Sequence, residues 1–374
     1  MFNVRRIPGL FYNNRYACVS ILIVSATVVY LLLRWGIVCT NLEAWHHVKR
    51  ACRLYEHGVA IGSFCRPLCS THDIHSLTCH SFRQGKEAVF SAEWHQTKLV
   101  FKTSRNVIQN LHWYDNGVKK YPSEREFRAI IRGIIHAKLN MTLSHENAVR
   151  LSRLKPSYEE HDIPKRQQEM DNLWPLVQDN EYLLSALYTD RDVFPQLLGT
   201  CGLYFAVEYL EPVQGVSTML STSDGQDDWG RRLKLAVMIM ELIDELDSSF
   251  REPFHLCDIK LNHFGMPKGG TRLKFIDLDT VYPRSVVNKI IKNTDSCSSD
   301  EDCDFYDCRA RCDMDSRLLM SQHTPSSLAA VLRQCANPES ESSKPRGTTP
   351  DDIRRRLYNI LVEIEQSVNN DFIL

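Results

Sequence analysis

The chain has 374 residues, of which 43% are hydrophobic and 24% charged, and its formal net charge is −1. This is the composition of a globular protein large enough for one large domain or two ordinary ones. The near-neutral charge and the absence of a polybasic segment exclude an electrostatic argument for nucleic-acid binding.

An apolar run near the N-terminus predicts a membrane anchor. Residues 17–33 are uncharged and follow a segment that is rich in arginine. When it is extended to residue 38, the run approaches the ~20 residues that cross a bilayer. A cleaved signal peptide is the alternative, but its apolar core usually has only ~7–15 residues. We therefore predict a short tail over residues 1–16 and an uncleaved transmembrane signal anchor over residues 17–38.

Cysteine usage indicates on which side of the membrane the rest of the chain lies. Of the thirteen cysteines, twelve lie beyond Cys18 of the predicted anchor, as does the one N-glycosylation sequon, which begins at Asn140. Both features are typical of an oxidising compartment. Zinc binding is the alternative, but neither Cys65-x3-Cys69 nor the cysteine group at 303–312 has paired C-x2-C knuckles. We predict a cytosolic tail, a lumenal body over residues 39–374, and disulfides whose pairing stays open.

The first part of the predicted body changes character near residue 80. Residues 39–80 carry five cysteines and little periodic apolar pattern, which predicts a disulfide-rich cap. Two β-rich runs follow, and the second ends in Lys102. A strand lysine of this kind holds nucleotide phosphates in the pattern V-A-I-K, although an exposed strand-end lysine is the alternative. The glycine-rich loop that should precede it is reduced to Gly85 and Val89.

A helical insert is predicted over about residues 103–170, where apolar residues recur at helical spacing after a proline. The end of the insert resembles a calcium-binding loop that would use Glu160, Asp162 and Glu169. Ile163, however, stands where such a loop requires glycine. We therefore predict a degenerate EF-hand-like segment without calcium.

A helix and two strands are predicted after the insert. Residues 174–188 have apolar side chains near one helical face, with Glu181 among them. The apolar runs 194–198 and 203–207 are separated by glycines and predict strands. Glu181 lies 27 residues before Glu208, a plausible length for a helix followed by two strands.

A crossover between two lobes is predicted directly after the second strand. Glu208 and Leu210 close that strand, and a proline and a glycine begin a loop beyond them. We predict both residues to contact a nucleotide. The N-terminal lobe then covers residues 81–210 and the C-terminal lobe covers residues 211–374.

Two acidic positions follow an amphipathic helix predicted over residues 227–250. Asp258 and Asp277 are 19 residues apart, and Gly269-Gly270 between them predicts a hairpin turn. In phosphoryl transfer one carboxylate orients the attacking hydroxyl while a second holds magnesium on the phosphates. Either acid alone is more often a turn residue or a solvated charge.

The remainder of the chain predicts four further features. The runs 273–276 and 281–282 predict a hairpin, and the cysteine group at 297–312 predicts a disulfide-tied acidic loop. Residues 336–349 have the composition of a low-complexity linker. An amphipathic C-terminal helix is predicted from residue 350.

The order of these pieces is more informative than any one of them. Lys102, Glu181, Glu208, Asp258 and Asp277 occur in the order that a protein-kinase fold requires. We predict an α+β, bilobal protein-kinase-like fold that carries an N-terminal transmembrane helix and a disulfide-rich cap.

The cysteine spacing resembles that of a known family. Its motifs here are Cys52-Arg-Leu-Tyr-Glu-His-Gly58 with Cys65-x3-Cys69, Leu173-Trp-Pro-Leu-Val-Gln-Asp-Asn-Glu181, Leu198-Gly-Thr-Cys-Gly202, Cys257-Asp258, Phe275-Ile-Asp277, and Cys297-x5-Cys303-x4-Cys308-x3-Cys312. Together they resemble the divergent protein kinase domain 1 family of cysteine-rich type II membrane proteins. The resemblance implies an endoplasmic-reticulum protein with a lumenal kinase-like domain and, in some members, an EF-hand-like insert.

The resemblance also implies roles for individual residues. Lys102 resembles the phosphate-binding lysine and Glu181 its ion-pair partner. Asp258 resembles the catalytic-loop acid, and Asp277 resembles the magnesium-binding acid. Lys260, two residues after Asp258, matches the lysine that contacts the transferred phosphate in many kinases.

Three departures from the protein-kinase pattern weaken the prediction of an active enzyme. The glycine-rich loop is degenerate, and Asp279 replaces the glycine of the D-F-G pattern. His263 stands where asparagine normally binds the second metal, although the neighbouring Asn262 would restore an amide ligand after a shift of one residue. We therefore predict a metal site formed by Asp277 with Asn262 or His263.

Two functions from different classes fit these residues. The first is a lumenal kinase that transfers the γ-phosphate of ATP, with Mg²⁺ or Mn²⁺, to a hydroxyl of a secretory protein or glycan. The second is a pseudokinase that binds a nucleotide or a partner as a scaffold. A cysteine-rich interaction module without kinase ancestry is a third reading, which the order of the five motifs disfavours.

Overall fold

The computed structural model describes residues 21–28, 30, 41–80, 86–104, 110–154, 162–213, 228–269, 272–292, 299–309, 311–313 and 318–320. The predicted linker, the predicted C-terminal helix and most of the predicted anchor lie outside these ranges. Residues 21–28 and 30 are helical and exposed. Within the ranges given, none of the helices combines the length and the apolar character needed to cross a membrane.

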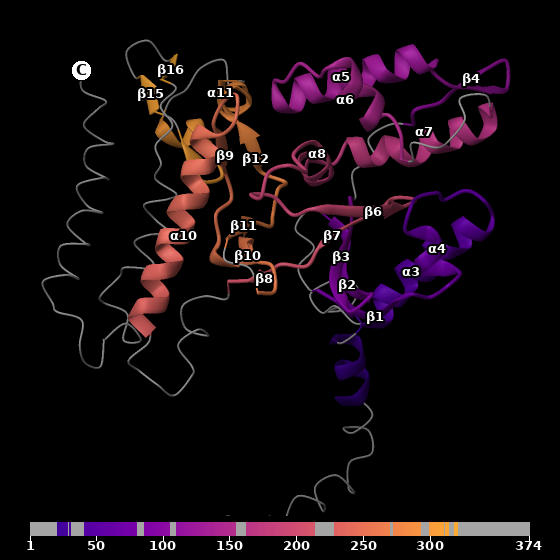
Figure 1. The fold of residues 1–374 in the computed structure, drawn as a ribbon, viewed down its shortest axis with the longest axis horizontal. Coiled ribbons are helices and arrows are strands. Elements are labelled where there is room, and N and C mark those ends of the chain that lie inside the picture. The colour runs from indigo at the N-terminus through magenta and orange to yellow at the C-terminus, as the bar shows by residue number, and fades with distance from the viewer. Residues whose placement is uncertain are drawn as a thin grey trace, which may run out of the picture.

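An antiparallel five-stranded sheet in the order β1-β2-β3-β7-β6 forms the N-terminal lobe (Figure 1). Its strands are β1 (Ile74–Cys79), β2 (Lys86–Trp94), β3 (Thr97–Ser104), β6 (Leu197–Cys201) and β7 (Tyr204–Glu208). The predicted β2–β3 hairpin and the two strands before the crossover are confirmed. Side chains alternate along β3, so Leu99 and Phe101 are fully buried against one face while Lys102 lies on the other.

The cysteine-rich segment packs on the sheet and contributes its edge strand, β1. Helices α3 (Asn41–Glu56) and α4 (Cys65–Cys69) precede that strand. Ala51 of α3 and Leu68 of α4 are buried in one cluster with Phe90 and Phe101 of the sheet. The segment therefore shares the core of the N-terminal lobe.

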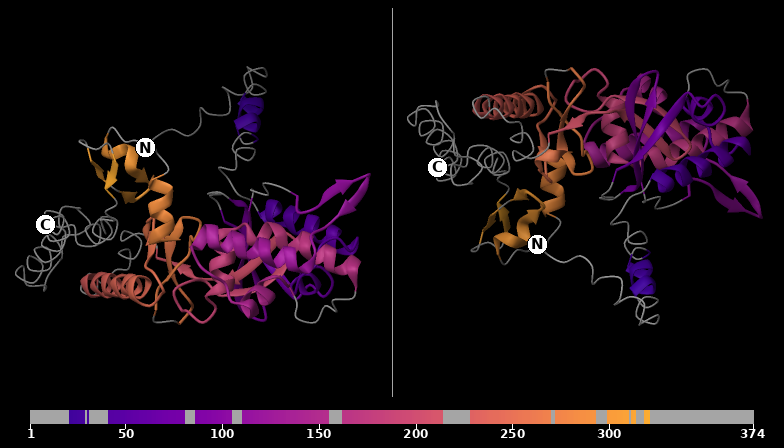
Figure 2. Two further views of the ribbon diagram at one scale, coloured as in Figure 1. Left: turned by 90° about the horizontal axis from the view of Figure 1, so that it is seen from above. Right: turned by 90° about the horizontal axis from the view of Figure 1, so that it is seen from below.

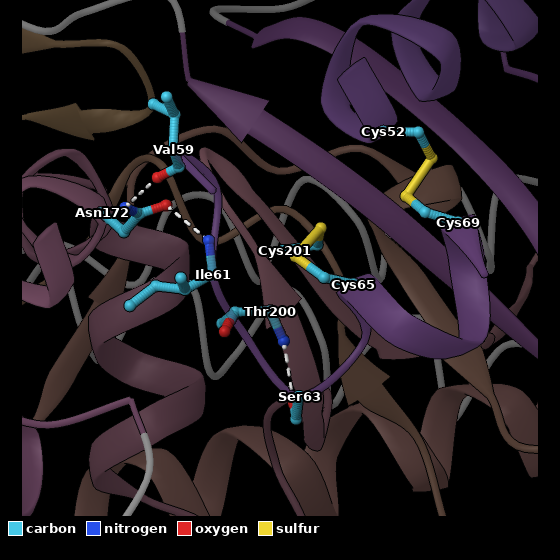
Figure 3. The surroundings of a disulfide bond; sticks show 9 residues. All are labelled: Cys52, Val59, Ile61, Ser63, Cys65, Cys69, Asn172, Thr200 and Cys201. Carbon is cyan, nitrogen blue, oxygen red and sulfur yellow. Dashed lines mark hydrogen bonds between the residues drawn. A yellow bond between two sulfur atoms is a disulfide. The ribbon is translucent and has the colours of Figure 1, made fainter. Parts of the chain in front are cut away.

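Two disulfides fasten the cysteine-rich segment (Figure 3). Cys52–Cys69 joins α3 to α4, and Cys65–Cys201 joins α4 to the end of β6. The second bond spans 136 residues of sequence. The disulfides predicted from composition are thus present, and Cys79 and Cys312 are also disulfide-bonded.

The loop between the two cap helices is held by polar contacts on both sides (Figure 3). Asn172 donates to Val59 O at 2.9 Å and accepts from Ile61 N at 3.1 Å. Gly62, between these contacts and α4, has a φ of +152°. A Cβ atom on Gly62 would lie 2.1 Å from Thr200 O, so only glycine allows the loop to approach β6 this closely.

Gly62→Ala is expected to destabilise the protein by about 1–3 kcal/mol, because the loop must move away from β6 or retain backbone strain. The thermal unfolding midpoint of the purified protein measures this loss. Gly133→Ala in an insert helix is the matched control, since no atom lies within 4 Å of its added Cβ. Equal midpoints for the two variants would contradict the proposed close approach.

The insert between β3 and β6 is largely helical. It consists of the hairpin β4 (Trp113–Asp115) and β5 (Val118–Lys120), followed by α5 (Glu124–Leu139), α6 (His145–Leu151), α7 (Ile163–Val177) and α8 (Asn180–Leu187). The β4–β5 hairpin projects from the body (Figure 2). The predicted amphipathic helix is confirmed as α5, which begins with a capping box formed by Ser123 and Glu126.

The single helix predicted over residues 174–188 is wrong, because the chain breaks between α7 and α8. Asp179 is the N-cap of α8, and its Oδ1 accepts from the amides of Glu181 and Tyr182. A carboxylate at this position satisfies amide groups that have no partner within the helix. Glu181 therefore lies in the first turn of a separate, short helix.

The C-terminal lobe combines short strands with two helices. Its elements are β8 (Glu211–Pro212), α10 (Asp228–Ser248), β9 (Phe254–Leu256), the 3-10 turn η2 (Leu261–His263), β10 (Phe264–Met266), β11 (Lys274–Phe275), β12 (Val281–Pro283) and α11 (Arg284–Lys292). The helix α10 confirms the one predicted from residue 227 and lies on the side of the molecule remote from the insert (Figure 1).

Strand pairing in this lobe differs from the prediction. The runs 273–276 and 281–282 do not form a hairpin with each other: β11 pairs with β10, and β12 pairs with β9. The intervening Leu278 is fully buried, and its amide donates to Glu181 of α8. The chain between the two runs therefore turns into the core, and each run pairs with an earlier strand.

Gly269, with a φ of +75°, lies in the β10–β11 connection, where the turn was predicted.

The second cysteine group packs against Cys257, the residue that precedes Asp258. It forms η3 (Asp300–Cys303), β13 (Asp304–Phe305), β14 (Cys308–Arg309), β15 (Arg311–Asp313) and β16 (Leu318–Met320). Cys257–Cys308 is a disulfide, and Val287 and Ile291 of α11 pack against it. The predicted disulfide-tied loop is thus attached directly to the chain at Asp258.

Candidate active site

Lys102 and Glu181 form a buried ion pair between β3 and α8. Lys102 Nζ lies 2.8 Å from Glu181 Oε2, and both side chains are less than a tenth exposed. Lys102 also donates to Ile276 O at 3.2 Å, and Glu181 Oε1 accepts from Leu278 N at 3.2 Å. Burial alone would raise the pKa of Glu181, but Lys102 and Lys86 lower it to about 2. The pair therefore connects the sheet, α8 and the segment around Asp277.

Asp258 follows β9 and is fixed from behind by the second cysteine group. Its neighbour Cys257 is disulfide-bonded to Cys308, and Ile259 N donates to Asp307 Oδ2 at 2.6 Å. The Asp258 carboxylate accepts from Lys260 Nζ at 3.0 Å. A disulfide before Asp258 and a hydrogen bond from the backbone after it thus hold the acid in place. The partner of its carboxylate is Lys260, the lysine predicted to act with it.

His263 lies between Asp258 and Asp277. Its Nδ1 is 3.0 Å from Asp258 O, and its Nε2 is 3.4 Å from Asp277 Oδ2. Burial lowers the pKa of His263, which favours the neutral ring. The neighbouring Asn262 is exposed. The structure therefore brings the histidine, rather than the asparagine, against the predicted metal-binding acid.

Asp277 follows β11 and lies 22% exposed at the edge of this group. Burial and the negative charge of Glu181 raise its pKa to about 6. Ligand atoms of Asp258, His263 and Asp277 all lie within 4.8 Å of one another. Carboxylate and imidazole groups at this spacing fit a divalent cation.

A cavity of about 490 Å³ opens between the lobes at this group. Of the nine predicted site residues, those that line it are Lys102, Glu181, Glu208, Leu210, Asn262, His263 and Asp277. Asp258 and Lys260 lie beside it through their contacts with His263 and with each other. Val89, Val100 and Val207 of the sheet form an apolar part of the wall beside the charged Lys102.

The crossover contributes backbone and apolar surface rather than a free carboxylate. Glu208 Oε1 lies 2.6 Å from Lys274 Nζ and accepts from Gln196 N at 2.8 Å. Leu210 is buried, and a Cβ on Gly265 of β10 would lie 2.9 Å from the Leu210 Cβ. The missing side chain at Gly265 thus allows the crossover to lie close against β10.

Family models match both halves of the chain. The model described as the protein-kinase domain of FAM69 matches residues 173–364, and the model described as the N-terminal, cysteine-rich, endoplasmic-reticulum part of FAM69 matches residues 10–178. The chain belongs to the FAM69 family. The family match confirms the resemblance inferred from the cysteine spacing and establishes a kinase-like domain with mixed α/β content and disulfides.

Similar solved structures include two bacterial proteins. One is Rv3197 of Mycobacterium tuberculosis in complex with erythromycin, with 14% identity, 71% of this chain and 67% of that chain covered, and a TM-score of 0.29. The other is the choline kinase LicA of Streptococcus pneumoniae, with 9% identity, 81% of this chain and 97% of that chain covered, and a TM-score of 0.22.

The site of this FAM69 protein contains a second buried lysine that the motifs did not reveal. Lys86, at the start of β2, lies 2.6 Å from Asp179 Oδ2, 2.9 Å from Asp279 Oδ1 and 3.6 Å from Glu181 Oε2. Burial alone would lower the pKa of Lys86, but these three carboxylates raise it above its ordinary value. Lys86 therefore joins β2 to α8 and to the segment that follows Asp277.

Lys86 accounts for one departure of this chain from the kinase pattern. Asp279 stands where the D-F-G pattern has glycine, and its carboxylate pairs with Lys86. Burial and Glu181 raise the pKa of Asp279 to about 7, because this carboxylate lies among other acids. The aspartate is therefore part of an ion-pair cluster around the buried Lys86 rather than an isolated loss of the glycine.

Of the predicted EF-hand-like residues, the structure describes Asp162 and Glu169, and these two carboxylates make separate ion pairs in the insert. Asp162 caps α7 and pairs with Lys165, whereas Glu169 accepts from Leu154 N at 2.6 Å and pairs with the buried Arg166. Glu160 lies outside the described residues. The carboxylate of Glu169 thus stabilises the insert by holding the Leu154 backbone and the Arg166 side chain together.

Proposed function

We propose that this FAM69 protein binds a nucleoside triphosphate between its lobes and transfers the γ-phosphate to a hydroxyl group. The observation that carries the proposal is the convergence of the Lys102–Glu181 ion pair and Asp277 on one cavity, with Asp258 beside it. Phosphoryl transfer relies on positioning and charge neutralisation, and these residue types supply both.

The proposed division of labour follows from the geometry. Lys102, oriented by Glu181, binds the phosphates of ATP, while the apolar wall at Val100 and Leu210 receives the base. Asp277, with His263 or Asn262 beside it, holds Mg²⁺ or Mn²⁺, which neutralises phosphate charge when bound.

Asp258 and Lys260 would act on the acceptor and on the transferred group. Asp258 accepts the proton of the attacking hydroxyl at its carboxylate, in the role of a general base. Its present partner, Lys260 Nζ, is 3.0 Å away and carries a positive charge near the place of transfer. A lysine there stabilises negative charge on a phosphoryl group as a point charge.

A pseudokinase is the second candidate function, and His263 is the observation that favours it. The imidazole lies against Asp277, where a kinase has an asparagine ligand. If the imidazole holds no metal there, the phosphate charge is not neutralised, and the cavity would then bind a nucleotide or a partner without transfer.

We propose the lumen of the endoplasmic reticulum as the place of this activity, with residues 17–38 as a single-pass type II anchor. The disulfides in the predicted lumenal body, among them Cys52–Cys69, Cys65–Cys201 and Cys257–Cys308, and the family description, which names the endoplasmic reticulum, support this location. The acceptor is then a secretory protein or a glycan. Asn140 of the sequon lies at the end of α5 and accepts from Lys289 Nζ at 3.3 Å.

Asp258→Asn is expected to lower phosphate transfer by at least about 100-fold, because asparagine cannot accept the hydroxyl proton. Transfer is measured from radiolabelled ATP by the purified full-length protein. A lumenal microsomal fraction is the acceptor, with and without glycosidase treatment, so that protein and glycan hydroxyls are distinguished.

The matched control for this experiment is Asp244→Asn, an exposed acid on α10. Equal transfer by Asp258→Asn and the unmodified protein would reject Asp258 as the base. If the unmodified protein shows no transfer but is stabilised thermally by ATP with a divalent metal, the scaffold function is favoured.

A further inference from the structure

The ring of His263 is held in one orientation by its surroundings. It is 94% buried and meets the Phe275 ring edge to face, at a centroid distance of 6.0 Å. Its Nδ1 lies 3.0 Å from Asp258 O, which places Nε2 at 3.4 Å from Asp277 Oδ2. The backbone also fixes this turn, because His263 N donates to Lys260 O and His263 O accepts from Ile276 N.

This orientation determines which nitrogen carries a lone pair. A carbonyl oxygen only accepts hydrogen bonds, so the contact with Asp258 O requires a proton on Nδ1. In the neutral ring Nε2 then presents its lone pair toward the carboxylate of Asp277. Two acceptor atoms facing each other at 3.4 Å repel unless a cation or a proton lies between them.

The same arrangement is the one in which histidine ligates metals. A metal-binding imidazole usually donates its other ring N–H to a backbone carbonyl or a carboxylate, which fixes the tautomer and the direction of the ligand nitrogen. Here Asp258 O accepts that bond, and Asp277 provides the second ligand atom.

The remaining candidate ligands are less suitable. The Asp258 carboxylate is within 4.8 Å of the other two groups, but its Oδ2 accepts from Lys260 Nζ. Asn262, the residue that would preserve the kinase pattern, is exposed and lies on the turn beside His263. His263 and Asp277 are therefore the core of the ligand set.

We propose that His263 and Asp277 together bind a first-row transition-metal ion in preference to Mg²⁺. Mg²⁺ favours oxygen ligands and retains its water, whereas imidazole nitrogen suits transition metals. The replacement of an asparagine oxygen by a histidine nitrogen then changes the metal that the site selects. This inference deepens the proposed function, since it rests on Asp277 as the metal-binding acid.

The test uses Mn²⁺ as the probe, because Mn²⁺ is paramagnetic and is the weakest binder of the first-row series. Electron spin echo measurements on Mn²⁺ added to the full-length protein should show coupling to an imidazole nitrogen. Growth with ¹⁵N-histidine should change this coupling, which identifies histidine in the unmodified protein.

Variants then identify which histidine is bound. His263→Asn should abolish the nitrogen coupling and lower the ratio of Mn²⁺ to Mg²⁺ affinity by about tenfold or more. His136→Asn, at an exposed position of α5, is the matched control and should change neither quantity. His263→Gln provides a second variant in case His263→Asn does not fold.

Three results would overturn the inference: Mn²⁺ bound without nitrogen coupling, coupling that survives in His263→Asn and His263→Gln, or no bound Mn²⁺. The first two leave the proposed function intact if phosphate transfer with Mg²⁺ is present. Nitrogen coupling from His263 in a protein that transfers no phosphate supports the metal site and rejects the proposed transfer alone.

Discussion

Glu181→Gln is expected to reduce the stability of the protein by about 3–5 kcal/mol and to abolish nucleotide binding, because removing one partner of a buried ion pair leaves uncompensated charge. Lys102 lies 2.8 Å and Lys86 lies 3.6 Å from the same carboxylate oxygen. Glutamine keeps the shape of the side chain and can still accept from Leu278 N. The loss of stability and of nucleotide binding therefore measures the effect of removing the negative charge.

The pH dependence gives this prediction a second readout. The pKa of Glu181 is lowered from 4.5 to about 2, so its contribution to stability is present above pH 4.5 and is lost as the pH falls toward 2. The difference in thermal midpoint between Glu181→Gln and the unmodified protein should therefore shrink as the pH falls below 4.5 toward 2.

The control for Glu181 is Glu93→Gln, an exposed carboxylate on β2. It should change neither the midpoint nor the thermal shift produced by ATP with a divalent metal. A Glu181→Gln protein that unfolds at the same temperature as this control, or that is still stabilised by ATP, would show that the ion pair has no part in either property.

Asp277→Asn is expected to make the metal-free protein more stable at neutral pH while it removes the response to metal. The pKa of Asp277 is raised from 3.8 to about 6, so ionising this group in the folded protein costs free energy. A raised pKa gives stability that is full below pH 3.8 and is lost as the pH rises through about 6.

The size of this effect follows from the two pKa values. Their difference, at about 1.4 kcal/mol per pH unit, amounts to about 3 kcal/mol at pH 7.5. Asparagine does not ionise, so the variant should equal the unmodified protein in stability near pH 4 and exceed it at pH 7.5. The negative charge on Asp277 that metal binding requires therefore destabilises the folded protein when no metal is bound.

Thermal midpoints at pH 4, 6 and 7.5, with a chelator and then with Mg²⁺ or Mn²⁺, measure both parts of the prediction. Asp244→Asn on the exposed side of α10 is the control. An Asp277→Asn protein less stable than this control at pH 7.5 would contradict the expected destabilisation by the Asp277 charge. A rise in thermal midpoint on adding metal that is preserved in the variant would exclude Asp277 as a ligand.

Much of the site could be predicted from the order of residues in the chain. The strand ending in Lys102 and the acids at 258 and 277 are local patterns, and the kinase-like order states which of them should meet. The Lys102–Glu181 contact bears out that expectation. The proximity of His263 to Asp277 has the same origin, since both flank the β10–β11 hairpin.

Lys86 could not be found in this way because of an irregularity in β2. Ala88, Phe90 and Ala92 are buried on the face that packs against the cap, and strict alternation would place Lys86 with them. The β2–β3 register shifts between Lys86 and Ala88, and the lysine instead reaches Asp179. A β-bulge of this kind redirects a side chain without leaving a periodic signal in the sequence.

The wrong pairing of residues 273–276 with 281–282 has a different cause. Two apolar runs separated by a short polar segment resemble a hairpin when only local sequence is considered. Here Leu278 is buried and its amide bonds to Glu181, 97 residues earlier in the chain. Contacts at that separation are set by the fold as a whole.

The Cys257–Cys308 disulfide ties the completion of this site to the compartment in which the chain folds. Asp258 is covalently adjacent to that bond, and Ile259 N is held by Asp307, the residue before Cys308. A newly made chain whose thiols are still reduced contains every site residue but lacks this attachment. Oxidation of two cysteines far apart in sequence is thus a step in assembling the candidate site as well as in stabilising the fold.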